Sequence, residues 1–142
     1  MNKLKALRLK IGKWILDKSS RSNNPQSLEH PNSFLFLRQD GKIGDYIVSS
    51  FVFREIKKFN PLIKIGVICT TQNAYLFQRN HNIDEIYLVK KRNILDYIKT
   101  ALFIRKERYD VVIDPTLVLR NRDLLLLRIL NARNYIGYRK AD

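Results

Sequence analysis

Short apolar runs alternate with amphipathic stretches from Ser33 onward, and this alternation limits most strongly what the chain can fold into. The apolar runs cover residues 34–37, 63–69, 85–89, 111–113 and 135–138. The amphipathic stretches cover residues 45–59, 74–79, 93–107 and 123–130. Strands that alternate with helices indicate βαβ units with right-handed crossovers. The sequence therefore predicts an α/β fold built on a parallel sheet with flanking helices.

The spacing of apolar residues supports the two longer helices. In residues 45–59, Val48, Val52 and Ile56 recur at i, i+4 and i+8. Residues 93–107 carry a comparable face, made of Ile94, Ile98, Ala101 and Leu102.

The chain divides into three regions. Residues 1–18 have the pattern of a basic amphipathic helix, and residues 19–32 are polar, contain two prolines and are predicted to be a linker. Residues 33–142 form the predicted folded domain. Because a doubly wound domain usually continues beyond a strand like 135–138, we expect this domain to be truncated.

Composition narrows the class of protein. With 45% hydrophobic residues, the 142-residue chain is predicted to be globular rather than disordered. A single cysteine, Cys69, excludes an internal disulfide, and no apolar run is long enough to span a membrane. We therefore expect a cytoplasmic protein. The net charge of +14 favours acidic partners such as phosphate groups, anionic lipid or nucleic acid.

The first 18 residues have two interpretations. Leu4, Leu7, Ile11, Trp14 and Ile15 share one stripe of a helical wheel, and six cations stand against one acid. Such a helix can lie in the headgroup layer of an anionic membrane. It can equally pack on the folded domain or on a partner chain, and the sequence leaves both open.

A turn rich in glycine and charge follows the first predicted strand. It runs from Arg38 to Asp45 and holds Gly41, Gly44 and Lys42. In an open α/β sheet such a turn lies at the carboxyl edge of the strands, where ligands bind. Glycine lets the backbone approach a ligand, and the following helix start favours anions.

Asp45 has two interpretations in this turn. As an N-cap or first-turn residue it would stabilise the helix by about 1 kcal/mol. As a general base it would take a proton from an attacking hydroxyl. Asp40, beside Gly41, is predicted to be a turn residue.

A second charged group follows the fourth predicted strand. Asp114 ends that strand and therefore lies at the same edge, and Arg120 and Arg122 follow in the next loop. These arginines are candidates to bind an anionic group, although each alone is also typical of a solvated surface.

Several enzyme classes find no support in the sequence. Ile43 occupies the place where a P-loop needs Ser or Thr, and the spaced glycines of a dinucleotide-binding turn are absent. His30, His81 and Cys69 are isolated, so we expect no metal site and no nucleophilic triad. No RNA- or DNA-binding motif is present, and we expect no nucleic acid partner.

Five segments in order resemble glycosyltransferase family 9, the lipopolysaccharide heptosyltransferase-like enzymes. They are an opening strand with an Ile43-Gly44-Asp45 turn, a first helix that stops at Pro61, the Ile83-Asp84-Glu85-Ile86 segment, the strand leading to Asp114, and Tyr135-Ile136-Gly137-Tyr138. The resemblance runs from Phe34 to Lys140 and covers the N-terminal half of such enzymes.

The resemblance implies a GT-B enzyme with two Rossmann-like halves, in which the N-terminal half binds the acceptor. Such enzymes transfer a sugar from a nucleotide-sugar onto the lipopolysaccharide core, with inversion and without a metal or other cofactor. Asp45 would be the base, and Lys42, Gly44, Arg120 and Arg122 would bind the acceptor.

Two departures from the family follow. The donor half is missing, so we expect this chain alone to be inactive unless a separate C-terminal half supplies it. The Asp114-Pro115-Thr116-Leu117 turn also differs from the family's usual one.

Residues 1–18 would bring the domain to the inner-membrane surface, where the glycolipid acceptor lies. The alternatives are a non-catalytic membrane-surface or adaptor domain, or an inert remnant.

Overall fold

The computed structural model describes residues 30–39, 43–90, 93–116 and 121–137. Its elements in chain order are β1 (Ser33–Arg38), α2 (Ile43–Phe59), β2 (Lys64–Cys69), α3 (Ala74–Gln78), β3 (Glu85–Leu88), α4 (Ile94–Lys106), β4 (Val111–Asp114), α5 (Asn121–Leu130) and β5 (Asn134–Gly137). Each predicted strand and helix from Ser33 onward is present, with ends within two residues of the prediction. The predicted helix at 1–18 and nearly all of the linker at 19–32 lie outside the described residues. None of the described helices is long and apolar enough to cross a lipid bilayer.

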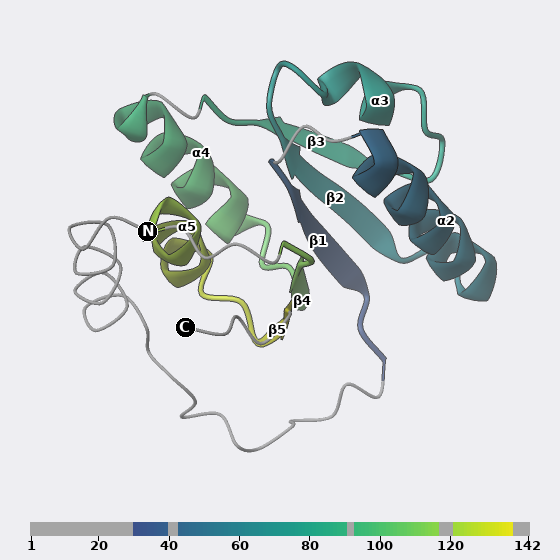
Figure 1. Cartoon of the computed structure of the whole chain (residues 1–142). Coiled ribbons are helices and arrows are strands. Elements are labelled where there is room, and N and C mark those ends of the chain that lie inside the picture. Colours follow the sequence, from purple (N-terminus) through teal and green to yellow (C-terminus); the bar gives the residue numbers. More distant parts are fainter. Residues whose placement is uncertain (1–29, 40–42, 91–92, 117–120, 138–142) are drawn as a thin grey trace.

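The five strands form one parallel sheet in the order β3-β2-β1-β4-β5 (Figure 1). Strand β1 is central, and its Phe36 lies opposite Val67 of β2 and Ile113 of β4. The chain winds outward from β1 to β3 and then crosses back to β4 and β5. This order is the Rossmann-like α/β arrangement that the alternation of strands and helices predicts.

Two apolar cores form, one on each face of the sheet. Helices α2 and α3 cover one face, and α4 and α5 cover the other (Figure 1). On the α2 side, Phe53 packs edge-on against Phe36 of β1, with ring centroids 4.8 Å apart. On the α4 side, Tyr97, Ala101 and Ile104 pack against the sheet. Residues of β1 to β4 therefore feed both cores, which explains why β1, β2 and β4 are mainly apolar.

Helix α2 buries only one end of the apolar stripe that indicated it, because Ile56 packs against the core while the rest of the stripe is exposed. Val48 is 65% exposed and Val52 is 36% exposed, whereas Ser49 and Phe53, one position further along, are buried. Ser49 is small and lets the helix approach the sheet, and its hydroxyl donates to the backbone carbonyl of Asp45 at 2.6 Å. Packing of Phe53 thus outweighs the Val48–Val52 stripe and leaves that stripe facing outward.

Helix α4 departs from its predicted face in the same way. Ala101 is fully buried as the pattern suggests, but Ile94 is 61% and Leu102 is 47% exposed. The helix turns Tyr97 and Ile104 inward instead. Asn93 caps its first turn by accepting a hydrogen bond from the Asp96 amide at 3.2 Å.

Two aspartates fasten the amino edge of the sheet, opposite the edge where ligands bind. The Asp84 carboxylate accepts from the Ile65 amide at 2.7 Å and from Lys57 Nζ at 2.8 Å, and so joins β2, the start of β3 and the end of α2. The Asp110 carboxylate accepts from the Asn32 amide at 3.0 Å and the Ser33 hydroxyl at 3.1 Å. Both therefore have structural roles, although both belong to segments that resemble the family.

Candidate active site

The strand order creates a topological switch point between β1 and β4. Helix α2 leads from β1 toward β2, whereas α5 leads from β4 toward β5, so the two connections diverge at the carboxyl edge. In open α/β sheets the crevice between two such connections is where ligands bind. The two charged groups singled out in the sequence, around Asp45 and around Arg122, follow these two strands and therefore lie at this edge of the sheet.

Gly44 and Asp45 lie in the first turn of α2. Because the helix begins at Ile43, Asp45 is its third residue rather than its N-cap. The side chain is half-buried, and its first-turn position places the carboxylate by the positive end of the helix dipole. Gly44 is exposed, and no atom lies within 4 Å of where a Cβ would be. Lys42 and Asp40, the other predicted members of this turn, lie outside the described residues.

Asp114 holds the turn that leaves β4. Its buried carboxylate accepts from the Thr116 hydroxyl at 2.6 Å and from the Thr116 amide at 3.1 Å. This local ring, typical of aspartate at a turn, fixes the path of the chain out of the sheet. Asp114 is therefore at the predicted edge and shapes the turn there.

Arg122 is in the first turn of α5 at the same edge. Its side chain is 31% exposed, and its Nε lies 3.7 Å from Oδ1 of Asp123, which is buried. At this distance the carboxylate balances charge without a hydrogen bond to Nε, and part of the guanidinium side chain stays open to solvent. Arg120 lies outside the described residues, so its position relative to Arg122 is untested.

A buried polar pair lies at the carboxyl end of β1. The Gln39 side chain follows β1 directly and meets the Tyr97 hydroxyl of α4, with Nε2 at 2.9 Å and Oε1 at 3.0 Å. Burial, reinforced by the negative charge of Asp123, raises the pKa of Tyr97 above its ordinary value. Tyr97 therefore stays neutral at physiological pH and fixes where the chain leaves β1.

A second polar group fixes the ends of β1 and β2. Asn73 donates to the backbone carbonyl of Arg38 at 2.8 Å and accepts from the Thr70 amide at 2.9 Å and the Thr70 hydroxyl at 2.8 Å. Gln39, Tyr97, Thr70 and Asn73 were not among the predicted site residues. The available signal was a polar residue close behind an apolar run, as Gln39 is behind 34–37 and Thr70 is behind 63–69.

The groups at this edge are of the kinds that bind anions and transfer protons. Two helix starts and the Arg122 guanidinium favour a negatively charged ligand. Asp45 adds a carboxylate at the same edge of the sheet. Within the described ranges, no group of three or more histidine, cysteine, aspartate or glutamate side chains is arranged to hold a metal ion.

Comparison with known proteins adds an independent line of support. No protein-family model matches the chain. Over 83 residues it is 26% identical to a protein of Escherichia coli (strain K12) that is provisionally named lipopolysaccharide heptosyltransferase 4; this match covers 58% of the chain and 23% of that protein. This chain resembles a family 9 glycosyltransferase. The heptosyltransferase-like identity expected from its motifs is thereby supported over part of its length.

The fold agrees with this resemblance. The structure is similar to that of the E. coli ADP-heptose lps heptosyltransferase II, with a TM-score of 0.61 and 17% sequence identity over 77% of this chain. The match covers 31% of the heptosyltransferase chain. The heptosyltransferase-like chain thus spans about a quarter to a third of the relatives that it matches.

Proposed function

We propose that this domain binds the acceptor for a heptosyltransferase-like glycosyltransferase. The complete enzyme would transfer a sugar from a nucleotide-sugar onto a lipopolysaccharide core or a similar anionic glycolipid. The observation that carries the proposal is the switch point between β1 and β4, where a first-turn carboxylate and a partly exposed guanidinium lie at one edge of the sheet.

Each side chain has a role that its position suits. The Arg122 guanidinium would bind a phosphate or carboxylate of the acceptor, with Lys42 and Arg120 adding charge from the adjoining turns. Gly44 would let the acceptor approach the start of α2 closely. Asp45 would accept the proton of the attacking hydroxyl as the new glycosidic bond forms in a single, inverting displacement.

The donor would bind elsewhere. In the proposed two-half enzyme, a second Rossmann-like half holds the nucleotide-sugar, and the reaction needs no metal. We therefore expect the 142-residue chain alone to bind an acceptor and to transfer no sugar, because a displacement needs both reactants held together. Sugar transfer by the purified chain would contradict this part of the proposal.

Calorimetric titration with a phosphorylated lipopolysaccharide core oligosaccharide tests the acceptor site. Loss of a charged hydrogen bond costs about 1.5–3 kcal/mol, so Arg122→Ala should weaken binding by about 10- to 100-fold. Arg128→Ala is the matched control, because Arg128 is exposed near the other end of α5. Equal effects of the two variants, or a wild-type chain that binds no oligosaccharide, would refute the proposed site.

The outward-facing stripe of α2 favours one alternative, a non-catalytic interaction domain that retains the fold. Such a domain would bind anionic vesicles or a protein partner and would not respond to the core oligosaccharide. The same titration, repeated with anionic vesicles, separates the two proposals.

A further inference from the structure

Helix α2 presents an apolar face that no described part of the chain covers. Ile47 is 62%, Val48 is 65%, Phe51 is 56% and Phe59 is 84% exposed. Isolated apolar residues on a surface are common, but a continuous row along one helix marks an interaction site. The row extends along nearly the whole of α2.

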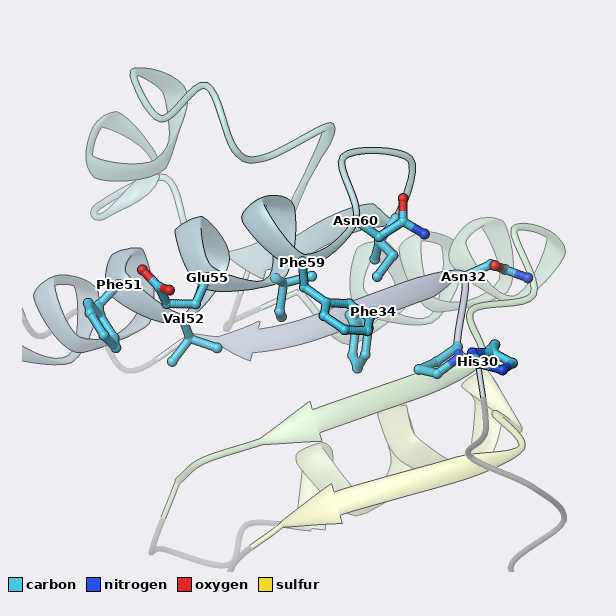
Figure 2. Close-up of a pocket in the computed structure, with 11 residues that line it drawn as sticks. His30, Asn32, Phe34, Phe51, Val52, Glu55, Phe59 and Asn60 are labelled. Atoms are coloured by element: carbon cyan, nitrogen blue, oxygen red, sulfur yellow. The ribbon is translucent and has the colours of Figure 1, made fainter.

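This face borders a groove of about 360 Å³ between α2 and the chain that leads into β1. Phe34, Phe51, Val52 and Phe59 line it, and Figure 2 shows these side chains on the side of α2 that faces the incoming chain at His30 and Asn32. The volume is near the lower end of the range for ligand pockets and suits a few large apolar side chains.

The polar side chains at the groove do not suggest a charged small ligand. Glu55 is at its wall, but its carboxylate already accepts from Arg54 Nε and Lys58 Nζ, each at 3.1 Å. The rim is held in place, since Asp110 binds both Asn32 and Ser33. The groove is thus a fixed, mainly apolar surface suited to an apolar helix face.

We propose that residues 1–18 of this same chain bind in this groove, along the apolar face of α2. Their stripe of Leu4, Leu7, Ile11, Trp14 and Ile15 would supply the apolar side chains. A helix of 18 residues is about 27 Å long, which matches the roughly 26 Å of the 17-residue α2.

The connection favours this occupant over a separate molecule. His30 and Pro31 line the groove themselves, so residues 19–29 alone separate the 1–18 segment from its rim. Eleven residues reach up to about 36–40 Å, more than the length of α2. A short tether also gives an effective concentration on the order of millimolar, which a free partner rarely attains.

The single tryptophan, Trp14, reports on this contact directly. In the full chain without lipid, we expect Trp14 emission at short wavelength and acrylamide quenching several-fold weaker than in urea. Val52→Glu places a charge in the groove and should restore strong quenching. Leu102→Glu, at an exposed site on α4 over the opposite face of the sheet, should leave the quenching unchanged.

Cross-linking locates the segment independently of folding effects. Ile11→Cys with Val52→Cys should form an intramolecular disulfide under mild oxidation, and Ile11→Cys with Leu102→Cys should not. The natural thiol does not compete, because Cys69 is buried. Disulfide dimers in place of the intramolecular link would show that a second copy occupies the groove and would overturn the proposal. A Trp14 that is fully quenched in buffer and protected only by anionic vesicles would overturn it in favour of membrane binding.

Discussion

At the residue scale, Gly66 and Gly44 differ in what a side chain would meet: packed core atoms at Gly66 and open space at Gly44. A Cβ on Gly66 would lie 2.7 Å from Cζ of Tyr109, whose hydroxyl is 2.9 Å from that of Tyr87 in the core. Gly66→Ala must therefore displace a packed ring, and we expect a loss of about 1–3 kcal/mol in the free energy of unfolding. Urea denaturation followed by far-UV circular dichroism measures it.

Gly44→Ala is the matched comparison for stability and also tests function. Open space surrounds this position, and alanine favours the helix, so the free energy of unfolding should stay equal or rise by up to about 1 kcal/mol. If Gly44 serves the acceptor, the same variant should bind the core oligosaccharide more weakly. Unchanged affinity would show that the glycine has no part in acceptor binding.

Asp45 is expected to act in the chemical step. In an enzyme assembled with a donor-binding half, Asp45→Asn should lower kcat by about 10²- to 10⁴-fold, the usual effect of removing a general base. The KM for the acceptor should change much less. A variant that keeps the full rate would leave Asp45 only its first-turn role in α2.

The Cys69 thiol should be inert in the native state. It is fully buried, and burial raises its pKa to about 12. A thiol-specific reagent at pH 8 should therefore react only after the chain unfolds in urea. Prompt reaction in native buffer would contradict the packing of β2.

At the scale of elements, the strands and their parallel arrangement follow directly from the sequence, but the faces of the helices do not. Helix α2 carries apolar residues on several sides, so its period alone could not distinguish the Val48–Val52 stripe from the Ser49–Phe53 face. Contact between Phe53 and Phe36 decides between them, and it depends on a strand that is distant in sequence. The place of Asp45 and Arg122 at one edge was predictable, because each follows a strand of the same parallel sheet. The hydrogen bond between Gln39 and Tyr97 was not, because it joins residues that are distant in sequence.

The Asp84 contacts connect three elements and give a test at this scale. Asp84→Ala removes the acceptor for the Ile65 amide and for Lys57, and should cost about 1–3 kcal/mol of folding free energy. Glu85→Ala, at the next and exposed position, should change it by no more than about 0.5 kcal/mol. Acceptor binding should survive in both variants, since these residues lie at the opposite edge of the sheet. Loss of binding in Asp84→Ala alone would instead give that segment a functional role.

At the scale of the whole molecule, the buried tyrosines predict a loss of stability in alkali. Burial raises the pKa of Tyr87, Tyr97 and Tyr109, whereas unfolded tyrosines titrate at about 10. Above that pH the unfolded chain binds fewer protons than the folded one, so the free energy of unfolding falls as pH rises. The urea midpoint should therefore be constant below about pH 9 and drop beyond pH 10. A midpoint that is flat to pH 11 would contradict the burial of these rings.

Mapping the acceptor onto the structure tests the central claim most directly. Amide chemical shifts of the ¹⁵N-labelled full chain would be followed by NMR during titration with the phosphorylated core oligosaccharide. The account predicts that the changes concentrate at the carboxyl edge, in residues 43–49 and 121–126, and diminish with added salt as charged contacts are screened. Changes confined to the amino edge around Asp84 and Asp110, or no changes at all, would contradict an acceptor site at the switch point between β1 and β4.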